Sequence, residues 1–316
     1  MSDPIIHASG LVKYFGNYRA VHNVGFAVER GSIYGVLGPN GAGKTTTIRM
    51  ILGIIEPDGG TRHVLGAAHP RDASHRIGYL PEERGLYPGM KAREAIAFMG
   101  ALRGLDWKEG RKRAGALMER AGLERVVDEK IRKMSKGMAQ MVQLMGSIVH
   151  RPELIVLDEP FSGLDPVNQE RLEALIQDER DRGATIVFST HVMAHAERLC
   201  DRIAIIAGSE RRFEGTVDEA RGSLPLRVRY APGAEADAAA LARILPPDAV
   251  VKDDGYSFII ADNGVDGLLK KLVAGGFGVS RLSIERPGLH DAFVRIVRDT
   301  GQDISDVPAV DAEVAV

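Results

Sequence analysis

Residues 38–45 form the glycine-rich run Gly-Pro-Asn-Gly-Ala-Gly-Lys-Thr, whose composition suits the binding of phosphate groups. Glycines let successive backbone N–H groups curl around phosphate oxygens, and the N-terminus of a following helix adds donors and a favourable dipole. We expect Lys44 to reach the terminal phosphates and Thr45 to offer its hydroxyl to Mg²⁺. The run predicts a site for a nucleoside triphosphate, whose candidate ligands are Gly38, Pro39, Asn40, Gly41, Ala42, Gly43, Lys44, Thr45 and Thr46.

The segments on either side of this run predict the elements that position it. Residues 32–37 are apolar and suit a buried strand, and residues 45–52 suit a helix. The glycines therefore lie where a strand becomes a helix, which is the context that a phosphate loop requires. This context argues against a chance match in a chain that contains 36 glycines.

Two carboxylates follow a second apolar stretch. Residues 154–157 predict a strand, and Asp158 and Glu159 would project from its carboxyl end, where ligands bind in open α/β sheets. We expect Asp158 to hold Mg²⁺ directly or through water, and Glu159 to polarise the attacking water as a general base. The alternative is a solvated acidic turn, against which the phosphate loop in the same chain argues.

Composition and charge narrow the function classes. With 316 residues and 44% hydrophobic content, the chain can bury a substantial core and is expected to hold two domains. The formal net charge of −2 leaves no overall basic excess, so nucleic acid is not expected as a partner. The sequence has no long apolar run and no leader pattern, which predicts a soluble, unexported chain. Cys200 is the only cysteine, which fits a cytosolic setting.

The chain divides into regions of different pattern. Residues 1–221 alternate apolar strands with helices after a β-rich start over 5–28, which predicts an α/β fold with a largely parallel sheet. Residues 87–150 predict a helical insertion, residues 222–300 a small α+β domain, and residues 301–316 a disordered tail. In the small domain we expect a βαββαβ, ferredoxin-like order and a closing helix, with strands at 226–230, 250–251, 256–260 and 278–285 and helices at 235–245, 267–273 and 291–297.

Further motifs follow the phosphate loop in a fixed order: Leu80-Pro-Glu-Glu83, Ser135-Lys-Gly137, Asp158-Glu-Pro160, Ser162-Gly-Leu-Asp165 and Ser189-Thr-His191. This ordered set resembles the ATP-binding subunit of an ABC transporter over about residues 5–220. The resemblance implies a P-loop NTPase fold with an ABC-type β-rich flank and a helical subdomain. It also implies that two such subunits, expected to be identical, meet head to tail around two molecules of MgATP and power an integral-membrane permease.

The resemblance implies roles for single residues. Ser135 and Gly137 would contact the nucleotide of the opposite subunit, and Asp165 would couple the two sites across the dimer. His191 would orient the terminal phosphate and the attacking water. As a lone residue after an apolar strand, His191 would more often be a packing or capping histidine. Phe15, or Tyr14 as the alternative, would stack on adenine.

Two segments depart from the family pattern. Glu82 stands where a glutamine is common; a carboxylate can still ligate Mg²⁺, although it adds a charge and loses an amide donor. The neighbouring residues 83–88 also fit a loop that faces the membrane partner. Lys136 and Met138 replace a common glycine and glutamine in the signature segment, residues 134–138.

The resemblance favours an ATPase that drives a separate permease from the cytoplasmic face of the cell membrane. The second domain and residues 82–87 and 286–293 are similar to subunits of drug- and sodium-efflux systems, which favours export. An ABC-type ATPase of translation or DNA maintenance is the alternative, but such proteins usually carry two cassettes or a long coiled coil. An unrelated P-loop kinase would lack the signature segment, and a GTPase would carry a base-recognition motif.

Overall fold

The computed structural model describes residues 3–83, 85–222, 224–233, 237–252 and 255–298. Within these residues the chain forms two compact units, one up to Val217 together with Ile296–Arg298, the other Asp218–Arg295. The domain boundary proposed from the sequence, residue 221, falls inside helix α7 (Val217–Gly222). The tail expected at 301–316 lies outside the described residues.

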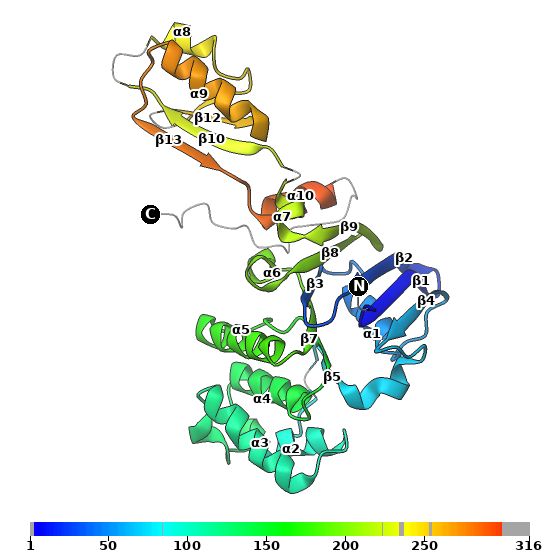
Figure 1. Cartoon of the computed structure of the whole chain (residues 1–316). Helices are drawn as coiled ribbons and strands as arrows, with labels where there is room; N and C mark the ends of the chain where they lie inside the picture. Colours follow the sequence, from blue (N-terminus) through cyan, green and yellow to red (C-terminus); the bar gives the residue numbers. More distant parts are fainter. Residues whose placement is uncertain (1–2, 84, 223, 234–236, 253–254, 299–316) are drawn as a thin grey trace. The chain divides into compact units, whose positions relative to one another are not determined.

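A six-stranded sheet forms the centre of the first unit (Figure 1). Its strands, in spatial order, are β5 (Ile77–Leu80), β6 (Leu154–Asp158), β7 (Thr185–Thr190), β3 (Ile33–Leu37), β8 (Arg202–Ala207) and β9 (Glu210–Thr216). Neighbours are parallel except β8 and β9, which confirms the largely parallel sheet predicted from the sequence. Every residue of β3, β6 and β7 is buried, as expected for strands covered on both faces.

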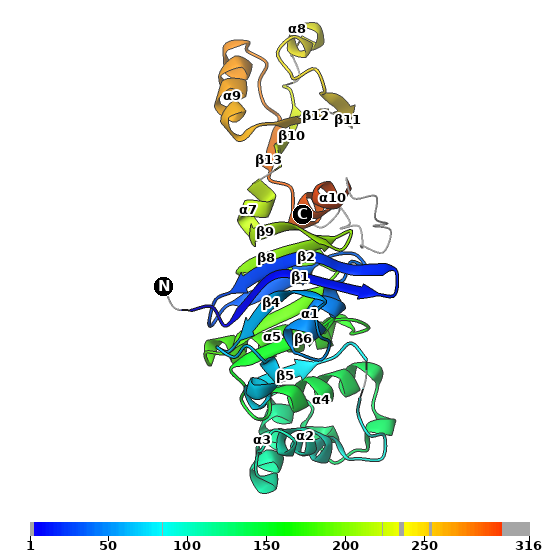
Figure 2. The ribbon, with the colours of Figure 1, turned by 90° about the vertical axis from the view of Figure 1, so that its right-hand side faces the viewer.

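Different elements cover the two faces of this sheet, as Figures 1 and 2 show. Helix α1 (Lys44–Ile51) packs on one face together with a second sheet, whose antiparallel strands are β2 (Tyr18–Val28), β1 (Ile6–Phe15) and β4 (Gly59–Val64). This sheet confirms the β-rich start. Helices α5 (Pro166–Asp181) and α6 (Met193–Leu199) contribute to the core on the opposite face.

Helices dominate the region between β5 and β6, as predicted for 87–150. They are α2 (Ala92–Ala101), α3 (Trp107–Arg120) and α4 (Lys136–Ile148), with short 3₁₀ turns at Glu124–Val126 and Ile131–Lys133; another 3₁₀ turn, Pro70–Arg76, comes just before β5. Their apolar faces share one core with the sheet residues that face α5. None of the helices in the described part of the chain is both long and apolar enough to cross a membrane.

The second unit contains a four-stranded antiparallel sheet of order β11, β12, β10, β13. Its elements follow the predicted βαββαβ order: β10 (Leu226–Ala231), α8 (Ala238–Ala242), β11 (Val250–Lys252), β12 (Gly255–Ile260), a 3₁₀ turn (Asp262–Gly264), α9 (Val265–Ala274) and β13 (Arg281–Glu285). Strand β13 begins at Arg281, later than expected, and Gly278, where the strand was expected to begin, has a left-handed φ of 64° that an extended strand does not contain. The closing helix α10 spans Leu289–Arg298.

Candidate active site

The predicted phosphate loop joins β3 to α1. At two of its positions glycine is required, because neighbouring backbone lies too close to leave room for a side chain. A Cβ on Gly38 would lie 2.2 Å from the carbonyl oxygen of Ile206, and one on Gly43 would lie 2.5 Å from that of Ala20. Gly43 is also the N-cap of α1 and has a left-handed φ of 102°. The loop therefore packs tightly against β8 and β2, and its N–H groups at the start of α1 form a surface suited to phosphate.

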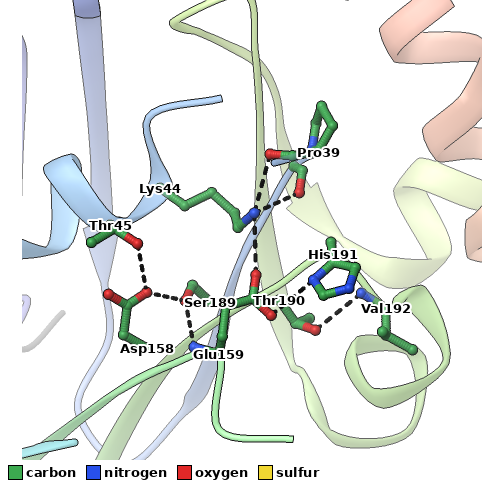
Figure 3. Close-up of polar contacts among 10 residues, drawn as sticks. Pro39, Lys44, Thr45, Asp158, Glu159, Ser189, Thr190, His191 and Val192 are labelled. Atoms are coloured by element: carbon green, nitrogen blue, oxygen red, sulfur yellow. Dashed lines mark hydrogen bonds and ion pairs between the residues drawn. The ribbon is translucent and has the colours of Figure 1, made fainter. Parts of the chain in front are cut away.

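Lys44 is the first residue of α1 and is almost fully buried, with 6% of its surface exposed. Its Nζ donates hydrogen bonds to the carbonyl oxygens of Gly38, at 2.8 Å, and Pro39, at 3.1 Å. The same nitrogen lies 3.2 Å from Oε1 of Glu159, as Figure 3 shows. The structure thus brings together the predicted phosphate-binding cation and the predicted general base.

Asp158 ends β6 and is held by two hydroxyl groups. Thr45 Oγ1 donates to Asp158 Oδ1 at 3.0 Å, and Ser189 Oγ donates to the same oxygen at 2.6 Å (Figure 3). Among the described residues, the buried Oδ2 of Asp158 has no hydrogen-bond partner. Burial raises the pKa of Asp158, although the two hydroxyl groups oppose this effect.

Ser189 is a site residue whose individual role the sequence motif did not indicate. Strands β6 and β7 are parallel neighbours, and their register places Ser189 beside Asp158. Besides donating to Asp158, Ser189 Oγ accepts the backbone N–H of Glu159 at 2.9 Å. The signal that could have found it is the polar residue near the carboxyl end of the apolar stretch at 185–190.

Glu159 and His191 follow β6 and β7 and form a pair. His191 Nδ1 lies 3.0 Å from Glu159 Oε2, and Glu159 has only 7% of its surface exposed. Burial by itself would raise the pKa of Glu159, but the hydrogen bond with His191 and the charge of Lys44 together lower it. An ionised carboxylate is therefore held in one orientation, with an imidazole beside it.

A cavity of about 400 Å³ extends from Glu159 along the phosphate loop. Its lining consists of Phe15, Tyr18, Ala20, residues 40–46, Glu82 and Glu159. Phe15 is half exposed, and the ammonium of Lys13 lies 5.8 Å from the centroid of its ring. Tyr14, the alternative to Phe15, is not among the lining residues.

Tyr18 lines this cavity and was missed from the sequence. Residues 16–17 form the turn between β1 and β2, so Tyr18 pairs directly with Phe15 across the hairpin. Its hydroxyl lies 3.5 Å from the carbonyl oxygen of Gly41, in the phosphate loop. The short glycine-containing turn between two strand-like segments is the signal that places these rings together.

Three predicted residues lie elsewhere in the unit. Ser135 is the N-cap of α4 and accepts the N–H of Met138 at 3.2 Å, and Asp165 is the N-cap of α5 and accepts the N–H of Asn168 at 3.0 Å. Gly137 packs against Asn168, where a Cβ would lie 2.9 Å from the amide nitrogen. Within the described chain, none of the three lines the cavity. Their expected contacts with an opposite subunit stay predictions.

The chemistry of the site follows from this arrangement. Loop N–H groups and Lys44 can bind a chain of phosphates, and the hairpin rings can contact an attached base. Glu159 is ionised, buried and fixed by His191, as required of a group that takes a proton from a water molecule. The geometry therefore suits hydrolysis of a nucleoside triphosphate.

Comparisons with known proteins agree with this geometry. A family profile described as ABC transporter matches residues 21–162. The chain is 34% identical over 291 residues to the uncharacterized ABC transporter ATP-binding protein YhaQ of Bacillus subtilis, covering 91% of this chain and 96% of YhaQ. It is 38% identical over 225 residues to the Nod factor export ATP-binding protein I of Ralstonia nicotianae, covering 69% of each chain.

Similarity to a solved structure supports the fold. The ATP-binding subunit of an ABC transporter is similar with a TM-score of 0.64 and 31% identity, covering 69% of this chain and 92% of that chain. This similarity confirms the P-loop NTPase fold class predicted from the sequence.

Proposed function

Because this chain belongs to the family of ABC transporter ATP-binding proteins, we propose that it binds and hydrolyses ATP to power a separate integral-membrane permease. The observation that most supports hydrolysis is the position of Glu159 between Lys44 and His191. In this proposal Glu159 takes a proton from the attacking water, and His191 holds the carboxylate and orients the terminal phosphate.

Magnesium fits the residues of the proposed site. Thr45 Oγ1 and Asp158 are oxygen ligands of the kind Mg²⁺ prefers, and Asp158 Oδ2 is buried without a hydrogen-bond partner among the described residues. No group of three or more His, Cys, Asp or Glu side chains suited to a metal occurs in the described chain. We infer from the first two observations that Thr45 and Asp158 would hold the cation, which would neutralise negative charge on the ATP phosphates.

Glu82 lines the cavity, and we propose that its carboxylate binds the metal ion or a water molecule on that ion. We expect Glu82→Gln to keep ATPase activity within about threefold of the parental rate, because the amide oxygen preserves an acceptor while the extra charge is lost. Steady-state phosphate release at saturating ATP measures this effect. A variant with no measurable ATPase would show that the carboxylate itself is required.

Phe15 is proposed as the residue that stacks on adenine. Phe15→Ala should weaken ATP binding by about 2- to 10-fold, because it removes an aromatic face worth roughly 0.5–1.5 kcal/mol. Tyr14→Ala is the matched control, since Tyr14 is similarly exposed but is not among the lining residues. Titration with a fluorescent ATP analogue compares the two; a larger loss in the Tyr14 variant would reverse the assignment.

The proposed working form is a homodimer whose subunits meet head to tail. Supporting this, Ser135, Gly137 and Asp165 lie away from the cavity in their own chain, although the sequence motifs predict contact with nucleotide. We propose that they complete the site of the opposite subunit. ATP binding would close the dimer, and hydrolysis with product release would reopen it.

The proposals of a permease partner and of a transport direction are based on the relatives. We propose export, because the Ralstonia relative is named for the export of Nod factor. We also propose that the chain lies on the cytoplasmic face of the membrane. Affinity purification of the tagged chain from detergent-solubilised membranes tests this. Recovery of an integral-membrane protein supports the transporter role, whereas recovery of ribosomes or DNA without one would favour the translation or DNA-maintenance alternative.

A further inference from the structure

His195 contacts the segment that follows the proposed general base. It lies on α6 with 4% of its surface exposed, and its ring stacks flat on that of Phe161, with centroids 3.9 Å apart and planes 7° from parallel. The Phe161 ring also makes an edge-to-face contact with Phe188 on β7, at 5.9 Å between centroids. Phe161 is thus held between two aromatic rings, two residues beyond Glu159.

The orientation of the His195 ring is fixed by one side chain of α5 and one of α6. Its Nδ1 lies 2.9 Å from Oε1 of Glu173 and 3.0 Å from Nη2 of Arg198. Depending on the tautomer, Nδ1 donates a hydrogen bond to the Glu173 carboxylate or accepts one from the Arg198 guanidinium. Either hydrogen bond keeps the ring in the same place. Burial lowers the pKa of His195 despite the nearby Glu173, which favours the neutral ring that stacks as an aromatic group.

The backbone at Glu159 needs support from its surroundings. Glu159 has a φ of 47°, a left-handed conformation that costs free energy for a residue other than glycine and persists only where neighbouring contacts hold it. Ser189 holds the N–H of Glu159 at 2.9 Å, and Gln140 makes a longer contact of 3.4 Å with the carbonyl oxygen of Pro160. Two residues after Glu159, the Phe161 side chain is held by a stacked ring, that of His195, and by the edge-to-face ring of Phe188.

The stack also borders open space. Phe161 and His195 line a second cavity of about 430 Å³, which Glu159 and His191 line as well. If the stack is lost, the segment after Glu159 has room on this side to move. A shift of about 1 Å in a reacting group can reduce a rate by as much as about 100-fold.

We propose that His195 is a positioning residue, which holds Phe161 in place by ring stacking and thereby keeps the Glu159 carboxylate in its productive orientation. This inference rests on the proposed function, since it assigns a role in ATP hydrolysis. His195 acts through Phe161 and does not touch the nucleotide.

The test compares variants that separate stacking from ion pairing. His195→Ala should lower kcat for ATP about 10-fold while the KM for ATP and the ATP dissociation constant stay within about twofold, because the phosphate loop is untouched. His195→Phe should restore most of kcat, because it keeps a flat ring on Phe161 but loses the contact with Glu173. Glu197→Ala, at an exposed position on the same helix, is the matched control and should keep the parental kcat.

Other outcomes overturn the proposal. A parental kcat in His195→Ala, no rescue by His195→Phe, or an equal loss of kcat in Glu197→Ala would each rule out positioning by the stack. If His195→Ala does not fold, as judged by thermal unfolding, His195→Leu replaces it, because leucine fills the space without a ring. Glu159→Gln in the same assay separates the positioning role of His195 from the proposed function. If Glu159→Gln abolishes hydrolysis, the proposed function stands whatever the His195 variants show.

Discussion

Glu159→Gln should reduce ATP hydrolysis by about 10²- to 10⁴-fold, the range by which a positioned general base accelerates a reaction. The substitution keeps the shape of the side chain but removes the group that takes the proton. Because the phosphate loop and Lys44 are unchanged, ATP should still bind. Single-turnover hydrolysis with radiolabelled ATP measures the rate, and equilibrium titration measures binding.

The same variant should accumulate as a closed dimer in the presence of ATP. Hydrolysis is the step proposed to reopen the two subunits, so blocking it leaves them joined. Size-exclusion chromatography with and without ATP detects the change in mass. Glu170→Gln, an exposed carboxylate on α5, is the control and should behave as the parental protein. If Glu159→Gln hydrolysed ATP at the parental rate, Glu159 would not be the general base.

Lys44→Ala should weaken ATP binding by about 10- to 100-fold, because a hydrogen bond to a charged group contributes roughly 1.5–3 kcal/mol. The loss appears in the dissociation constant itself, which distinguishes it from Glu159→Gln. The substitution also leaves Glu159 without its neighbouring cation, at 3.2 Å in the parental protein. We therefore expect slower hydrolysis even when ATP saturates the site.

The control for this substitution is Lys112→Ala, which removes an exposed lysine from α3. Isothermal titration calorimetry of both variants gives the affinities, and thermal unfolding without nucleotide shows whether the fold is kept. An unchanged ATP affinity in Lys44→Ala would contradict its assignment to the phosphates.

The local parts of the site could be predicted from the sequence, because each rests on a short, contiguous pattern. The glycine run between a strand and a helix marks the phosphate loop, and an apolar strand that ends in two carboxylates marks Asp158 and Glu159. Contacts between distant segments could not be predicted in the same way. Ser189 lies beside Asp158 only because β7 is the neighbour of β6, which depends on the strand order of the whole sheet.

Two further features depend on packing. The left-handed φ of Glu159 follows from the turn after β6, and nothing in the residue type indicates it. His195 is one polar residue on a short helix until the fold places Phe161 against its ring. Tyr18 could have been predicted from the sequence, because a two-residue turn pairs it with Phe15.

The open hairpin that carries Phe15 and Tyr18 bears on which nucleotide the protein would use in a cell. Of the described residues that line the cavity, the hairpin supplies two aromatic side chains and Ala20, and the Tyr18 hydroxyl is the one polar side-chain group among them. Stacking accepts any base, whereas discrimination between adenine and guanine needs hydrogen bonds to their edges. Selection between purine triphosphates would then follow their relative cellular concentrations more than any preference built into this hairpin.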